Sequence, residues 1–165
     1  MASRNTKAMG QRSIWTRSVD AVRARFIAAH FAQWQKRRVS LRKRGRALET
    51  REIGDYGERW ACKAIWAAGG QVRYRNFFAP SGGEVDIVAR EGQFLCFIEV
   101  KTRTYRNEGR PADAVDLQKQ ELIERGGRYW LKLLGNPPLA SRYDIVEVFL
   151  VEGELPEVKW VRNAF

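Results

Sequence analysis

The sequence predicts an α/β protein with a mixed sheet, its core elements following in the order helix, strand, strand, strand, helix, strand. Two segments carry apolar side chains at helical spacing: residues 51–68 and 113–134. Four shorter segments are rich in Val, Ile, Phe and Tyr, as buried strands are: residues 72–78, 84–90, 94–102 and 143–151. Because short turns join the first three strands, we expect an antiparallel meander, and the fourth strand can pair in parallel after its helical crossover.

The first helix is expected to end at Gly69 and Gly70. Its apolar stripe carries one carboxylate, because Glu58 falls on the same side of the helix as Ala61 and Ile65. A carboxylate on the core side needs a partner. Two interpretations stay open: an ion pair with an arginine such as Arg75, or a place at a metal site.

The second and third strands form a hairpin around residues 91–93, and their polar residues keep a two-residue spacing. These polar residues are Glu84 and Asp86 on one strand, then Glu99, Lys101 and Arg103 on the other. Side chains alternate sides along a strand, so each set projects from one side, and Val85, Ile87, Ile98 and Val100 project from the other. If the two polar sides coincide, the hairpin presents three carboxylates and an ammonium group together.

Clustered carboxylates repel one another and are costly to bury, which indicates a bound cation. Mg²⁺ or Mn²⁺ suits Asp86, Glu99 and the carbonyl of Val100 as ligands. Lys101 would lie beside the ion, where it could orient or deprotonate a water, and the site could stabilise charge on a phosphate. The alternative is a solvated hairpin surface, which these residues alone do not exclude.

The elements after the hairpin add further candidates. Residues 104–111 read as a loop, and the second helix then carries Lys119 near its start, where it either reaches a phosphate or lies at the surface. In that helix we expect Val115, Leu122, Gly126, Tyr129, Trp130 and Leu133 to be buried. Arg142 and Asp144 on the fourth strand are interpreted as a structural pair, and residues 157–161 as a short edge strand.

The charge of the chain is strongly asymmetric. Residues 1–50 hold 13 basic and 2 acidic residues and so the whole excess of +11, whereas residues 51–165 hold 17 of each. We therefore expect a basic, partly disordered extension over residues 1–50 and an α/β domain over residues 51–165. Such an extension suits nucleic acid or an anionic membrane surface, and the basic run Arg42, Lys43 and Arg44 is a candidate DNA contact or a solvated linker.

The extension also contains one amphipathic helix, beginning near Ser18. Apolar residues recur there at helical spacing among arginines: Val19, Val22, Phe26, Ile27, Phe31 and Trp34. This helix either packs on protein, follows a phosphate backbone or lies on a membrane surface, the last being the least expected. Two cysteines without a CxxC pair, one histidine and no long apolar run point to a reducing, cytoplasmic setting.

The motifs of residues 51–165 resemble those of the YraN family, a bacterial group of endonuclease-like proteins in the PD-(D/E)xK nuclease superfamily, similar in fold to archaeal Holliday-junction resolvases. The resemblance rests on these motifs: Gly54-Asp-Tyr-Gly-Glu58, Gly83-Glu-Val-Asp86, Phe97-Ile-Glu99-Val-Lys101-Thr-Arg103, Ala114-Val115, Lys119, Arg142-Tyr-Asp144 and Asn163-Ala-Phe165. It implies a restriction-endonuclease-like core in which Asp86, Glu99 and Lys101 carry the chemistry. It also implies that Glu58 lies near the metal and that Lys119 is functional.

Two functions follow as hypotheses. The first is a Mg²⁺- or Mn²⁺-dependent DNA endonuclease, with branched or structured DNA as a candidate substrate, in which Glu84 and Glu58 support the site and Arg103 contacts DNA. Junction cutting needs two active sites, so the resemblance to resolvases implies a homodimer. The alternative is a non-catalytic nucleic-acid-binding or scaffolding module that keeps the nuclease fold.

Overall fold

The computed structural model describes residues 36–80, 82–105 and 115–165. Its elements follow in the order β1 (Arg42–Lys43), β2 (Arg46–Ala47), α2 (Thr50–Ala67), β3 (Gln71–Phe78), β4 (Glu84–Glu91), β5 (Phe94–Arg103), α3 (Leu117–Leu133), β6 (Ser141–Phe149) and β7 (Glu157–Val161). The amphipathic helix expected from Ser18 and most of the loop expected at 104–111 lie outside the described residues. The α/β class and the mixed sheet are confirmed.

Five strands form the main sheet in the order β3-β4-β5-β6-β7. The first three make the expected antiparallel meander, β6 pairs in parallel with β5, and β7 closes the sheet antiparallel to β6. The parallel register is long, running from the Leu95–Ser141 pair to the Arg103–Phe149 pair. Because the chain returns through α3 to place β6 beside β5, β5 is the central strand of the sheet.

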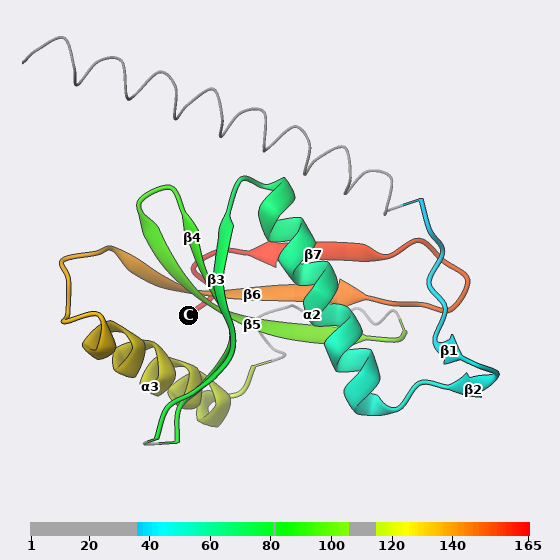
Figure 1. Ribbon diagram of the computed structural model, residues 1–165, viewed down its shortest axis with the longest axis horizontal. Coiled ribbons are helices and arrows are strands. Elements are labelled where there is room, and N and C mark those ends of the chain that lie inside the picture. Colours follow the sequence, from blue (N-terminus) through cyan, green and yellow to red (C-terminus); the bar gives the residue numbers. More distant parts are fainter. Residues whose placement is uncertain (1–35, 81, 106–114) are drawn as a thin grey trace, which may run out of the picture.

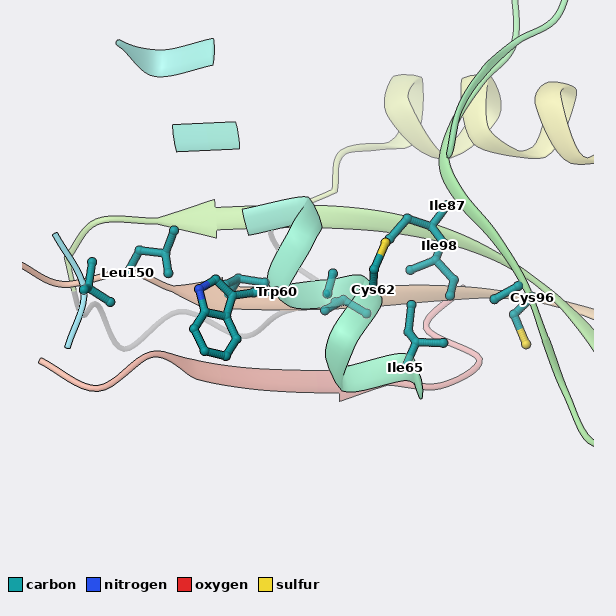
Figure 2. Packing of buried hydrophobic residues seen from close by; sticks show 12 residues of the cluster. Trp60, Cys62, Ile65, Ile87, Cys96, Ile98 and Leu150 are labelled. Carbon is teal, nitrogen blue, oxygen red and sulfur yellow. The ribbon is translucent and has the colours of Figure 1, made fainter. Parts of the chain in front are cut away.

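Helices α2 and α3 cover opposite sides of this sheet (Figure 1). Successive residues of β5 alternate between two buried clusters: Cys96 and Ile98 pack in the α2 cluster, and Leu95 and Phe97 pack in the α3 cluster. Figure 2 shows the α2 side, where Cys62 of the helix and Ile87 and Ile98 of the sheet belong to one buried cluster. The strands are apolar on both sides because both sides are covered.

The start of α3 differs from the sequence prediction. The helix begins at Leu117 rather than at residue 113, because Asp116 has an extended backbone and its side chain accepts a hydrogen bond from Lys119 N at 2.8 Å. Its buried side is centred on Ile123, whereas Leu133, predicted to be buried, is 60% exposed in the last turn. Helical spacing predicted the buried side of α3, but it did not predict that the last turn is exposed.

Val39 and Leu41 pack against the same core as the rest of the described chain. Val39 is 2% exposed in the α2 cluster, and its main chain pairs with Glu154 and Gly153 at 2.7 and 2.9 Å. The basic run that follows forms the short exposed hairpin β1–β2, with Arg44 and Gly45 at positive φ in its turn. Packing thus crosses the expected division at residue 50.

Arg142 and Asp144 form the structural pair expected on β6. Asp144 is fully buried and accepts hydrogen bonds from Arg142 Nε, Trp160 Nε1 and Asn163 N at 2.9, 3.0 and 2.8 Å. These bonds hold β7 and the C-terminal residues on the sheet.

Neither helix in the described part of the chain is long and apolar enough to cross a bilayer.

Candidate active site

The candidate site lies where β4 and β5 separate. Their ladder runs from the Glu91–Phe94 pair only as far as the Ile87–Ile98 pair. Beyond that point β4 stays paired with β3 and β5 with β6, so both strands continue in the sheet without each other. Figure 1 shows the fork: β3 and β4 bend together toward α3, whereas β5 runs on beneath α2.

Asp86 lies in this fork and replaces part of the missing ladder. Its Oδ2 accepts a hydrogen bond from Val100 N at 2.8 Å. Burial raises the pKa of Asp86 to about 7, with Glu99 as the second cause, while the Val100 N–H and Lys119 oppose the shift. Asp86 and Glu99 are therefore close enough to repel each other.

Glu99 is a buried carboxylate, 3% exposed, with a lysine on each side. Its Oε1 lies 2.9 Å from Lys101 Nζ, and its Oε2 lies 3.4 Å from Lys119 Nζ. Oε2 is buried and has no hydrogen-bond partner in the described chain, so the Lys119 contact is an ion pair without hydrogen-bonding geometry. An acceptor left in this state costs free energy unless another cation binds it.

Glu84 joins the same group through Lys119, whose Nζ also lies 3.4 Å from Glu84 Oε2. Burial would lower the pKa of Lys119, but Glu99, Asp86 and Glu84 together raise it above its ordinary value. The structure thus brings together Glu84, Asp86, Glu99 and Lys101, as the alternation along the hairpin predicts. It adds Lys119 from the facing helix.

The apolar side of the hairpin is less regular than the spacing predicts. Ile87, Ile98 and Val100 pack in or against the α2 cluster as expected, but Val85 packs in the α3 cluster. A Cβ on Gly126 of α3 would lie 2.8 Å from Val85 Cγ2, so the helix touches β4 at this residue. That contact draws Val85 to the α3 side.

Glu58 and Arg103 have partners that reduce their freedom to act at the site. Glu58 forms the expected ion pair with Arg75 at 2.7 Å, yet it also contributes to the raised pKa of Asp86, so it lies within electrostatic reach. Arg103 Nε donates to Glu147 Oε1 at 2.9 Å. Both roles proposed for these residues, metal support and DNA contact, stay predictions.

The basic run is separate from this group. Arg42, Lys43 and Arg44 are exposed on the β1–β2 hairpin, where Lys43 lies 3.7 Å from Glu52 of α2. The DNA contact predicted for these residues stays a prediction, and it would lie beside α2, away from the carboxylates of β4 and β5.

Sequence reasoning missed Glu147 and Gly57. Glu147 is 2% exposed on β6, opposite Lys101 in the parallel register, and it is the carboxylate that holds Arg103. The available signal was a charged residue inside the apolar run of β6. Its partner could not be predicted, because Glu147 bonds Arg103 and not Lys101, the residue opposite it in the register. Gly57 brings α2 against β5, as a Cβ there would lie 1.8 Å from Thr102 Oγ1.

The residues present fit a divalent ion that keeps open positions. Among the described residues, no three His, Cys, Asp or Glu side chains come together as a metal-binding group, so the candidate donors are two carboxylates. Asp86 and Glu99 supply two carboxylates, and Glu99 has one buried oxygen without a hydrogen bond and two lysine neighbours. Mg²⁺ is commonly held by one or two carboxylates, with waters and substrate phosphates completing its shell, so this donor set suits it.

Comparisons with known proteins place these residues in one family. A model of the family described as "Uncharacterised protein family UPF0102" matches residues 57–148. This range includes the whole candidate site: Glu84, Asp86, Glu99, Lys101 and Lys119. A UPF0102 protein of Caldicellulosiruptor saccharolyticus is 34% identical over 119 residues, covering 72% of this chain and 100% of the relative. UPF0102 proteins of Rhodococcus jostii and Symbiobacterium thermophilum are 37% and 36% identical, covering 68% and 70% of this chain and 95% and 98% of the relatives. The chain therefore belongs to the UPF0102 family, the YraN family that its sequence motifs indicate.

Proposed function

We propose that the protein is a divalent-metal-dependent DNA endonuclease that hydrolyses a phosphodiester, with branched or structured DNA as its candidate substrate. The observation that supports this most directly is the environment of Glu99. Its carboxylate is buried beside Asp86, and one of its oxygens accepts no hydrogen bond. The two carboxylates are partly or fully buried, repel each other and have lysines beside them. Such an arrangement suits a site that binds a metal ion and a phosphate.

Each residue then has a defined task. Asp86 and Glu99 hold Mg²⁺ or Mn²⁺, with the Val100 carbonyl as a further oxygen beside them. When bound, the ion supplies Lewis-acid stabilisation of the phosphate and lowers the pKa of a nearby water. Lys101, which now contacts Glu99 Oε1, positions that water or holds its proton, because it lies on the same strand two residues beyond Glu99.

Glu84 and Glu58 act around this centre. Glu84 holds Lys119, and Glu58 holds Arg75 at the side of α2. The candidate site has three carboxylates and two ammonium groups, which belong to Glu84, Asp86, Glu99, Lys101 and Lys119. It therefore carries one negative charge when all are ionised, which favours a cation before a phosphate arrives.

The fold supports the same proposal. A mixed sheet with an antiparallel meander, a helical crossover and a parallel strand, covered by one helix on each side, is the arrangement expected of a restriction-endonuclease-like core. At the fork between β4 and β5 both strands stay in the sheet, paired with β3 and β6, and the carboxylates of the group lie on them. Fold alone does not give function, and the side chains in the fork carry the argument.

The test is cleavage of linear, flapped and four-way DNA by the full-length protein in Mg²⁺ or Mn²⁺. We expect cutting of at least one of these DNAs, and loss of cutting in Asp86→Asn and Glu99→Gln. Glu121→Gln, which removes one exposed carboxylate from α3, is the matched control and should cut normally.

The alternative function predicts a different pattern. If the native protein binds DNA but cuts none of these substrates, it acts as a non-catalytic nucleic-acid-binding or scaffolding module. Cutting that survives both Asp86→Asn and Glu99→Gln would show that the activity does not come from this site.

A further inference from the structure

Lys119 lies between two carboxylates that come from different strands. Its Nζ is 3.4 Å from Glu84 Oε2 on β4 and 3.4 Å from Glu99 Oε2 on β5, and its side chain is 23% exposed. The Glu99 oxygen is the one without a hydrogen bond. The ammonium therefore offsets the charge of that oxygen without satisfying it as an acceptor.

The backbone holds Lys119 in this place from two sides. Asp116 caps the helix by accepting a hydrogen bond from Lys119 N at 2.8 Å. Farther along α3, a Cβ on Gly126 would lie 3.1 Å from Glu84 N, so the lack of a side chain lets the helix rest directly on β4. The middle of α3 is thus fixed on β4 at Glu84, and Lys119, about two turns earlier in the helix, bridges the fork.

Lys101 contacts the same carboxylate differently. Its Nζ lies 2.9 Å from Glu99 Oε1, which leaves Oε2 to Lys119. Oε2 is the oxygen that an incoming ion would use, because Oε1 already has a close partner. An ion that bound Glu99 through Oε2 would therefore compete with Lys119 and not with Lys101.

We propose that Lys119 is an internal counter-cation: it keeps Glu84 and Glu99 together before a divalent ion binds, and it must leave Glu99 Oε2 when the ion arrives. This inference rests on the proposed metal-dependent function and adds a competition to it. Since both cations need one oxygen, the lysine lowers the affinity of the site for the metal, and metal uptake releases an ammonium group beside the ion. Without a metal, removing the lysine leaves Glu84 and Glu99 without the positive charge that lies between them. The fork should then be less stable.

The experiment measures Mn²⁺ binding to the full-length chain without DNA, by the electron paramagnetic resonance signal of free Mn²⁺. Lys119→Met should bind Mn²⁺ about ten-fold more tightly than the native chain, because a competing positive charge is gone. Without metal it should also unfold at a lower temperature. Lys132→Met is the matched control, since Lys132 is exposed in the last turn of the same helix, and it should change neither quantity.

The outcomes separate this inference from the proposed function. Mn²⁺ binding that is lost in Asp86→Asn but is equal or weaker in Lys119→Met would overturn the competition and leave the metal site standing. Absence of Asp86-dependent Mn²⁺ binding in every variant would overturn both. Circular dichroism checks folding, and Lys119→Gln, which removes the charge and keeps a polar end near Glu84, gives the same comparison if the methionine variant does not fold.

Discussion

At the scale of one residue, Asp86 lowers the stability of the folded chain at neutral pH. Its pKa rises from 3.8 to about 7 through burial and the charge of Glu99. Between these two pH values the folded chain keeps a proton that the unfolded chain has released, so the contribution of Asp86 to stability is fully present below pH 3.8 and is lost as pH rises through 7. A carboxylate that weakens the fold at neutral pH is expected where function requires it.

Asp86→Asn should therefore stabilise the protein at pH 8 when no divalent ion is present. The gain in the free energy of unfolding should be on the order of 2 kcal/mol, because the amide keeps an acceptor for Val100 N and carries no charge to bury. The gain should shrink toward zero at pH 4. Thermal melts of both proteins at the two pH values in a chelator measure it, and an equal difference at both pH values would contradict the pKa argument.

Lys101→Met should separate metal capture from chemistry. The variant keeps the apolar stem and loses the ammonium group 2.9 Å from Glu99, so the stabilisation by Mg²⁺ should remain. Cleavage should fall by about 100-fold or more, with the loss in turnover rather than in DNA affinity. Single-turnover nicking, together with DNA affinity in Ca²⁺, measures both, and native-like cleavage would remove Lys101 from the mechanism.

The two-residue spacing on the hairpin was enough to predict the group of Glu84, Asp86, Glu99 and Lys101, because strand geometry places alternate residues on one side. Spacing did not reveal the hydrogen bond from Val100 N to Asp86, since this bond depends on where the ladder stops. The partners of Arg103 and Lys119 also come from other elements. Their positions follow from the parallel register and from the packing of α3, neither of which local pattern specifies.

At the scale of elements, close contacts through glycine set the position of both helices. Gly57 brings α2 onto Thr102 of β5, and Gly83 meets the backbone of Gly126, where an added Cβ would lie 2.3 Å from Gly126 N. The type and approximate bounds of α2, α3 and the five strands of the main sheet followed from apolar periodicity, whereas the β1–β2 hairpin did not. The distance of each helix from the sheet did not, because it depends on the absence of a side chain at one residue.

Gly57→Ala should therefore destabilise the protein by about 2 kcal/mol or more, since overpacking moves α2 away from the strand that carries Glu99. Gly54→Ala is the control in the same helix, because nothing lies within 4 Å of its added Cβ. That change should instead stabilise the helix by up to about 1 kcal/mol. Urea unfolding of the three proteins compares them, and the same sign for both substitutions would show that the contact with Thr102 does not limit packing.

Along the whole molecule, a basic flank is followed by a stretch of balanced charge. Residues 51–165 hold equal numbers of basic and acidic side chains, so the charge of +11 comes from residues 1–50. Part of that flank, the β1–β2 hairpin, is fixed to the core through Val39 and presents Arg42, Lys43 and Arg44 to solvent. A phosphate backbone in contact with this hairpin would release counterions, and its affinity would depend steeply on salt.

Neutralising Arg42, Lys43 and Arg44 together, each to Gln, should weaken binding to duplex DNA of any sequence. The slope of log affinity against log salt should fall in magnitude by about 2 to 3, because each phosphate contact contributes about 0.9 to the slope for duplex DNA. The core should be unaffected, since all three side chains are exposed. A matched triple, Arg73, Arg128 and Lys132 to Gln, removes the same charge from exposed positions on β3 and α3. If the hairpin is a DNA-contacting surface, only the first triple lowers the slope. Equal loss in both would mean that affinity follows net charge alone, and an unchanged slope in the first would move the DNA contact away from the hairpin.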